Sequence, residues 1–349
     1  TGVGIAVGAV ALAWLLTSWS IFGQIFGQVE EETLDWRVRA AGRFEADSGD
    51  ANPRADESRI RLILFDSLAT RDWPYEAPYP RGVLAELIDI ASSLGARAIG
   101  VDVWLENRQT PEQAYLDSAR YGRGGDDMLR DAIERAGNVV LVGPSVAAGA
   151  GRRQFLAPNP YFADVAAAVA TADLLTPFET IRDAALTVRA GDRLVAGFAT
   201  ALYAVGRGLD VESLMEATER QGYLDIAGIP PRYARLTDEA VQQLPILFVG
   251  PPSHREDGPG AFTRYSSADI AALGPFTPAE WFQDRILLLG SGFHAEEKFR
   301  TPFYDEVTPA GDSYGWTYGV EVHASALDNL LTGAFPVPLS WPARIRRAR

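Results

Sequence analysis

The sequence has 349 residues, of which 47% are hydrophobic and none is cysteine, and its formal net charge is -14 at pH 7. The absence of cysteine excludes disulfides, cysteine-based zinc sites and cysteine nucleophiles. The acidic balance argues against nucleic acid as a partner, because a nucleic-acid surface needs clustered lysine and arginine. The length is enough for one large hydrophobic core.

Residues 1–28 predict a transmembrane helix. No charged side chain occurs before Glu30, and the apolar residues 3–22 have the length that crosses a bilayer, about 20 residues at about 1.5 Å each. Trp14 and Trp19 are suited to the membrane interface. The alternative is a signal peptide, whose apolar region is usually shorter, about 7–15 residues. We therefore expect the lipid bilayer to be a partner of this chain.

The membrane helix also carries a possible contact face. Gly4 and Gly8, and again Gly23 and Gly27, have the Gly-x-x-x-Gly spacing that lets two membrane helices approach closely. The spacing indicates a homodimer through this helix, although glycine is also simply common in membrane helices. Residues 29–57 are expected to continue the helix out of the membrane and then to form a polar loop.

Two buried strands are predicted next, and each delivers an aspartate near its carboxyl end. Residues 59–65 lead to Asp66, and residues 97–103 contain Asp102, with a helix predicted between them at 83–94. In an open α/β sheet, ligands usually bind at the carboxyl ends of the strands. The alternative is that these aspartates cap the following helix or fix a loop.

The middle of the chain carries weaker signals. We predict a helix at 126–136, a strand at 138–143, a helix at 193–206 and a strand at 246–250. Residues 107–125 are typical of a loop or an irregular helix. The segments between these elements have no clear period, so their structure is left open.

The last structured part of the chain predicts an α/β unit. Residues 284–292 contain a continuous apolar run between a charged pair and a Gly-Ser-Gly, typical of a strand buried on both faces, and residues 319–331 have helical spacing before Gly333. The fold class expected from all these elements is α/β. It is a single large three-layer domain over residues 58–335, with a largely parallel central sheet and helices on both faces. Residues 336–349 form a basic tail.

This order of elements resembles the second class of CHASE domains, the extracytoplasmic sensor modules of bacterial cyclases, histidine kinases and related receptors. The resemblance rests on a terminal strand, a Thr-Pro loop, a Gly-Val-Glu-x-His-Ala helix, a juxtamembrane Asp-x-Arg-x-Arg element and a Trp-Pro…Pro-Arg stretch. In this sequence these are residues 286–290, Thr301-Pro302, residues 319–324, Asp35 with Arg37 and Arg39, and Trp73-Pro74 with Pro80-Arg81.

The resemblance implies a membrane-anchored extracytoplasmic domain of a bacterial signalling receptor, held in the inner membrane, that senses or binds a ligand. It implies no catalysis and no cofactor. A ligand is expected near a set of five residues, which are Asp66, Arg81, Asp102, Thr301 and His323. The second hypothesis is a structural accessory subunit of a larger membrane complex, bound to its other subunits. The inserted residues 75–79, and Glu296-Glu297-Lys298 where the family usually has an aspartate, favour this alternative.

Other chemistry has weaker support. Ser313 lies in a Gly-x-Ser-x-Gly pattern, but the hydrolase elbow needs a preceding strand and a loop is expected here. His294 with Glu296 and Glu297 is at most half of a metal site, because no tight ligand spacing is present. Gly290-Ser291-Gly292 follows a strand but lacks the third glycine of a dinucleotide loop. We therefore expect neither an enzyme nor a metal protein.

Glu321 and His323 lie two residues apart on the last predicted helix, on nearly opposite sides of a turn, so one of them is expected to face the sheet. A buried charged group needs a partner. We predict Arg81 or Arg300 as the partner of Glu321.

Overall fold

The computed structural model describes most of the predicted domain. The described residues are 35, 58–71, 73, 79–149, 151–175, 180–226, 228–236, 240–253, 260–292, 298–305 and 315–336. The predicted membrane helix 1–28, with its glycine spacings, lies outside them. So do the juxtamembrane residues 29–57 apart from Asp35 and the basic tail after Pro336. Among the helices that the structure does describe, none is long and apolar enough to cross a bilayer.

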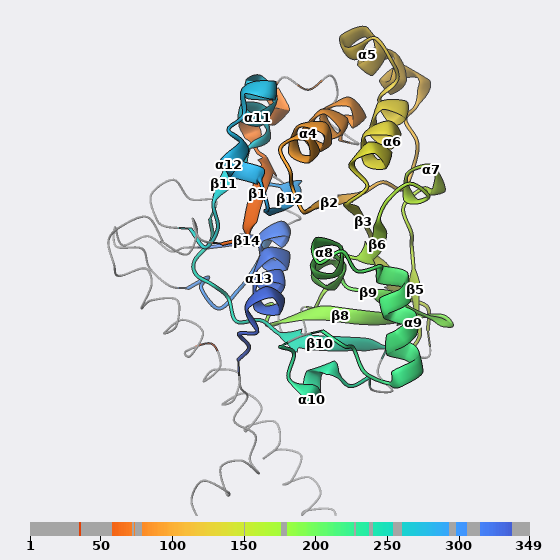
Figure 1. The fold of residues 1–349 in the computed structure, drawn as a ribbon, viewed down its shortest axis with the longest axis vertical. Helices are drawn as coiled ribbons and strands as arrows, with labels where there is room; N and C mark the ends of the chain where they lie inside the picture. Colours follow the sequence, from red (N-terminus) through yellow and green to blue (C-terminus); the bar gives the residue numbers. More distant parts are fainter. Residues whose placement is uncertain are drawn as a thin grey trace, which may run out of the picture.

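A six-stranded sheet forms the centre of the molecule, and every pairing in it is parallel (Figure 1). Apolar runs such as IRLILF are buried along their whole length because both faces of the sheet are covered. This confirms the predicted α/β class with a largely parallel sheet. The strand order is β11 (Arg264–Ser266), β1 (Ile60–Phe65), β12 (Ile286–Ser291), β2 (Ala98–Trp104), β3 (Val139–Gly143) and β6 (Ala168–Thr171).

Alternate side chains of each strand point to opposite faces, and helices cover both. On one face, Leu287 and Leu289 of β12 join the core formed with α4 (Arg81–Ser93), α6 (Gly125–Ala136), α11 (Ser267–Leu273) and α12 (Ala279–Phe282). On the other face, Ile286 and Leu288 pack into the core of α8 (Phe198–Gly206) and α13 (Gly319–Thr332). Each fully buried leucine or isoleucine contributes about 1.5–3 kcal/mol.

The approach of α8 to the sheet depends on a glycine. A Cβ atom at Gly100 of β2 would lie 2.7 Å from the Phe198 ring and 3.0 Å from Leu202. The helix predicted at 193–206 begins later than expected. Its first residues form β9 (Arg193–Ala196), which pairs with a neighbouring strand, and the helix starts after Gly197.

A second sheet, which the sequence did not predict, packs on α8 from the side opposite to the parallel sheet (Figure 1). Its central strand is β8 (Asp183–Ala190), which pairs antiparallel with β7 (Leu174–Leu175), β9 and β10 (Val241–Pro245). The hairpin β4 (Ser145–Ala147) and β5 (Arg153–Phe155) joins β8 through one parallel bridge. The domain therefore has four layers of helices and sheets, whereas three were predicted.

The predicted strand at 246–250 is wrong, because the paired residues are the five before it. Ile246 still donates its N–H to the carbonyl oxygen of Arg182, at 2.8 Å. The backbone of Leu247 is instead bound by the side chain of Asn329 on α13. Its N–H donates to Oδ1 at 2.7 Å and its carbonyl accepts from Nδ2 at 2.9 Å. A side chain thus takes the place of a strand neighbour.

Short elements complete the domain. Residues 107–125 contain a regular helix, α5 (Pro111–Tyr121), whose start is fixed by a capping box of Thr110 and Gln113. The remaining elements are α3 (Ser67–Arg71), α5 (Pro111–Tyr121), α7 (Pro160–Ala163), α9 (Val211–Gln221), α10 (Pro231–Ala234), η1 (Gly274–Phe276), β13 (Lys298–Phe299) and β14 (Thr317–Tyr318).

Candidate functional site

At the carboxyl edge of the parallel sheet, the connections that follow the neighbouring strands β12 and β2 lead to opposite faces of the sheet. The chain leaves β12 toward α13 on one face, whereas it leaves β2 toward α5 and α6, the latter on the other face. Such a switch point opens a crevice in which α/β proteins usually bind ligands. Asp102 lies there, because a Cβ atom at Gly290 of β12 would be 3.3 Å from the Asp102 Cβ.

A cavity of about 340 Å³ opens beside Asp102, and we call it the edge cavity. Its volume lies near the lower end of the range for small-molecule sites, about 300–1,000 Å³. Loop and strand ends from β2, β3 and β6 form its walls. The described residues that line it are Tyr79, Asp102, Val103, Trp104, Val142, Gly143, Pro144, Ala172 and Asp173.

Asp173 is held in place by the β4–β5 hairpin. Its Oδ1 accepts from the N–H of Ser145 at 2.9 Å, and its Oδ2 accepts from Arg153 Nη2 at 2.9 Å and from the Ser145 hydroxyl. Arg153 also donates to the Ser145 hydroxyl at 2.6 Å and to the Ser145 carbonyl at 2.7 Å. The carboxylate therefore has a fixed orientation at the cavity wall.

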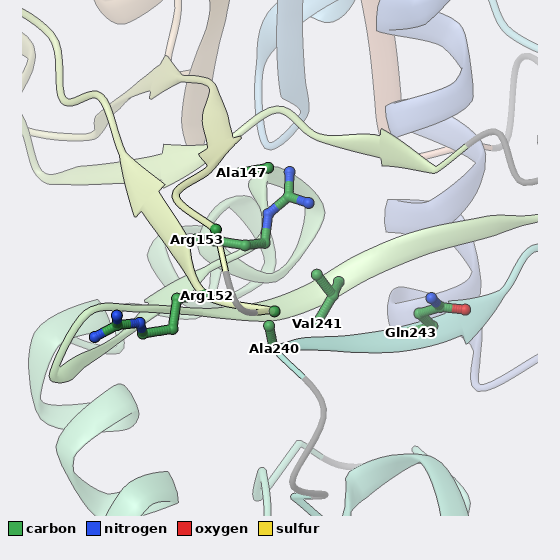
Figure 2. A pocket seen from close by; sticks show the side chains of 8 residues that line it. Ala147, Arg152, Arg153, Ala240, Val241 and Gln243 are labelled. Carbon is green, nitrogen blue, oxygen red and sulfur yellow. The ribbon is translucent and has the colours of Figure 1, made fainter.

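Arg153, which binds Asp173 of the edge cavity, also lines a second depression beside the hairpin. Figure 2 shows that depression, of about 310 Å³, with Arg152 and Arg153 pointing in different directions. Arg152 is exposed, whereas the Arg153 guanidinium is committed to Asp173 and Ser145. The second depression is lined by Ala147, Gly149, Gly151, Arg152, Arg153, Ala240, Val241 and Gln243.

His323 supports the edge cavity without lining it. It is 4% exposed, and its ring meets the edge of Phe198 at 5.2 Å between centroids. Burial lowers the pKa of His323 to about 4, against the opposing effects of a hydrogen bond to the backbone of Ala172 and of the Asp173 charge. A neutral imidazole thus holds the segment that carries Asp173.

Four of the five predicted site residues lie outside the edge-cavity lining, which are His323 and the three described next. Asp66 accepts from the N–H of Ala69 at 2.9 Å, which is the helix-capping alternative. Arg81 is 1% exposed, 3.8 Å from Asp126 and bonded to the Asn107 carbonyl at 3.2 Å. The Thr301 hydroxyl lies 3.2 Å from that of Thr317 in a buried pair.

The predicted partners of Glu321 are wrong. Arg81 is engaged with Asp126, and Arg300 pairs with Asp305 at 2.5 Å. Glu321 Oε1 instead accepts from the N–H and the hydroxyl of Ser253, both at 2.7 Å. Burial raises the pKa of Glu321 to about 7, partly offset by the Ser253 hydrogen bonds and by the charge of Arg264.

Asp35 is the only residue of the juxtamembrane segment 29–57 that the structure describes. Its carboxylate pairs with Arg182 through two hydrogen bonds, from Nε at 2.9 Å and from Nη2 at 3.0 Å. The Asp35 side chain is 10% exposed and that of Arg182 is 16% exposed. This pairing ties the element to the start of β8.

Some predicted chemistry falls outside the described part of the chain. The residues outside the described ranges are Ser313 of the Gly-x-Ser-x-Gly pattern and His294, Glu296 and Glu297 of the possible metal site. Ser291 is the last residue of β12 and is buried. Within the ranges that the structure describes, no group of three His, Cys, Asp or Glu side chains could hold a metal ion.

Sequence reasoning missed the three other lining residues that carry an aromatic or charged side chain, Tyr79, Trp104 and Asp173. Trp104 and Asp173 each follow an apolar run at the carboxyl edge, which is the signal that found Asp102. Tyr79 ends the inserted residues 75–79, whose sequence carries no signal for a ligand site. The short run before Asp173 consists mainly of alanine, so it was not recognised as a strand.

The family of the chain follows from a match over nearly its whole length. A sequence model described as the CHASE2 domain matches residues 6–346. The chain belongs to the CHASE2 domain family. This family consists of extracytoplasmic sensory domains, which supports a sensory role. The chain matches no curated protein and no solved structure at a significant level.

Proposed function

We propose that this CHASE2 domain is the membrane-anchored sensory part of a bacterial signalling receptor, and that it binds its ligand in the edge cavity. Family membership supports the sensory role, and the apolar residues 1–28 support the anchor. The cavity's position at the switch point supports ligand binding there.

The observation that carries the proposal is a short connection between the cavity and the juxtamembrane element. Asp173 leads directly into β7, where Leu175 pairs with Asp183 of β8. The residue before Asp183 is Arg182, which binds Asp35. A shift of Asp173 on ligand binding would therefore be transmitted over two paired strands to the segment that follows the predicted membrane helix.

The anchor and the side of the membrane can be tested with a reporter fusion. A phosphatase that needs disulfides, and is therefore active only in an oxidising compartment, is fused after Pro336, so that residues 1–336 precede it. We expect membrane-bound phosphatase activity. The matched control lacks residues 1–28 and should be neither membrane-bound nor active. Equal activity with and without residues 1–28 would contradict the anchor.

The receptor and the accessory-subunit hypotheses differ in what is attached to the domain. The measurement is the intact mass of the protein purified from its native membrane, together with co-purifying chains. A mass well above 37.8 kDa, with an attached output module, is expected for a receptor. A mass close to that value, with stoichiometric partner subunits, would replace the receptor proposal with the structural accessory subunit.

A further inference from the structure

The carboxyl group of Glu321 is buried without a cationic partner. Glu321 lies in the first turn of α13 and is 3% exposed. Both of its hydrogen bonds come from neutral groups of Ser253, and Glu321 forms no ion pair within the described residues. A buried carboxylate that is bound only by neutral donors is costly, so burial favours the protonated form.

Ser253 attaches a loop to α13 through these bonds. We call residues 251–253 and 260–262 the loop base, because they hold the two ends of the loop together. The Ser253 hydroxyl accepts from the N–H of Phe262 at 2.8 Å, and a backbone hydrogen bond of 3.1 Å also joins the two segments. Because the same hydroxyl donates to Glu321, the loop base and the carboxyl group of α13 form one hydrogen-bonded unit.

Among the described residues, one charged side chain, that of Arg264, acts on Glu321. Arg264 begins β11 two residues after the loop base, is partly exposed and has no ion pair within the described ranges. Its charge favours the ionised carboxylate, whereas burial, the larger effect, disfavours it. The other titratable or charged side chains on α13, on β11 and on the elements packed against α13 are Arg61 of β1, Tyr203 of α8, Tyr265 of β11, Tyr318 of β14, and His323 and Asp328 of α13. The loop residues 254–259 lie outside the described part of the chain.

We infer that Glu321 and the loop base form a proton-operated switch, through which the domain responds to the pH of its compartment. The closed state is the arrangement described above, and it favours neutral Glu321. In the open state the loop base has moved away from α13, the carboxyl group has released its proton to water, and water hydrates the carboxylate. Closing takes the proton back.

The position of the switch in the fold gives it a route to the end of the domain. Glu321 lies at the start of α13, and the chain runs from the other end of this helix to Pro336 (Figure 1). A helix of 14 residues is a rigid element about 21 Å long. A change at its first turn is therefore carried to the segment that precedes the predicted basic tail. The switch adds an input to the proposed sensory function and does not depend on a ligand in the edge cavity.

The expected effect of pH follows from the burial of the carboxyl group. In the closed state burial raises the pKa of Glu321 from 4.5 to about 7, whereas the hydrated group of the open state has its ordinary value. The closed state is therefore fully favoured below pH 4.5 and loses this advantage as pH rises to about 7. The ratio of open to closed molecules should rise about 300-fold over this range and then level off, because the two pKa values differ by about 2.5.

The test is hydrogen exchange of the full chain in detergent, followed by mass spectrometry, at pH values from 4.5 to 8.5. The reporters are the N–H groups of Ser253 and Phe262, which are hydrogen-bonded only in the closed state. The reference is β3, a fully buried strand whose exchange requires opening of the whole domain. After correction for the intrinsic effect of pH on exchange, we expect protection of the two reporters to fall by up to about 300-fold relative to β3.

Three variants locate the proton. Glu321→Gln cannot ionise, and its loop base should stay protected at every pH. Arg264→Gln removes the charge that favours ionisation, so protection should level off at a higher pH than in the parent. Glu280→Gln, at an exposed glutamate of α12, is the matched control and should behave as the parent does. The Tm of each variant shows whether it is folded.

Three outcomes would overturn the inference. The first is protection of the loop base that does not change with pH in the parent. The second is a change that β3 shows to the same extent, because pH would then act on the stability of the whole domain and not on a local switch. The third is a Glu321→Gln variant that keeps the pH dependence of the parent. The reporter fusion and the intact mass judge the proposed function separately.

Discussion

The buried carboxyl of Glu321 gives the sharpest prediction, because its proton equilibrium differs between the folded and unfolded chain. Burial raises the pKa of Glu321 in the folded protein from its ordinary value of 4.5 to about 7. Between these values the folded state holds a proton that the unfolded state has released. The free energy of unfolding therefore falls as pH rises through this window. The pKa difference corresponds to about 3 kcal/mol.

Replacing Glu321 with glutamine removes this titration and keeps the hydrogen bonds. The amide oxygen can still accept from the Ser253 N–H and hydroxyl, which now bind Oε1 at 2.7 Å. We expect Glu321→Gln to have nearly the stability of the parent protein at pH 4.5. At pH 8 we expect it to be more stable by about 3 kcal/mol.

The assay is urea denaturation followed by tryptophan fluorescence, at pH values from 4.5 to 8. The quantity of interest is the difference in unfolding free energy between variant and parent, because His323 and other titrating groups are common to both and cancel. Glu280→Gln, at an exposed glutamate of α12, is the matched control for replacing a glutamate by glutamine and should change the unfolding free energy little. A constant difference for Glu321→Gln, or one that favours the parent as pH rises, would refute the reasoning.

Three further predictions test other parts of the structure. Because burial lowers the pKa of His323 to about 4, the parent should lose stability relative to His323→Gln as pH falls from about 6.5 to 4, by up to about 3 kcal/mol in urea denaturation. Gly100→Ala should destabilise the protein by about 1–3 kcal/mol and lower its Tm, since the new methyl would lie 2.7 Å from the Phe198 ring; an unchanged Tm would contradict this packing. Arg182→Ala should uncouple the juxtamembrane element, so that proteolysis of residues 36–57 in the full chain accelerates, and Asp35→Ala should add nothing further in the double variant.

Much of the parallel sheet could be predicted because its signals are local. Strands β1, β2, β3 and β12 are apolar runs four to eight residues long, and such runs are stable only when both faces are covered. The helices on those faces carry their own start and end signals, such as Gly333 after α13, whose φ of 69° suits a left-handed helix end. These patterns are complete within a few residues, so no tertiary information was needed to find them.

The second sheet could not be predicted for the opposite reason. Its strands are mostly two to five residues long, and their pairing depends on partners that are distant in the sequence. Residues 246–250 have the composition of a strand, yet Asn329 binds the backbone of Leu247 from a helix 82 positions away. Composition says that such a segment will be buried, but the neighbouring element decides whether it pairs as a strand.

The residues of the candidate site were likewise predictable only in part. Asp102 was found because parallel strands place their carboxyl ends at one edge, a rule that the sequence alone can apply. Tertiary structure alone decided that Tyr79, Trp104 and Asp173 share its cavity and that Glu321 binds Ser253. Local apolar patterns determine which segments are buried as strands and helices. The long-range contacts of polar side chains depend on how those elements stack, because a hydrogen bond forms only where packing brings donor and acceptor within about 3 Å.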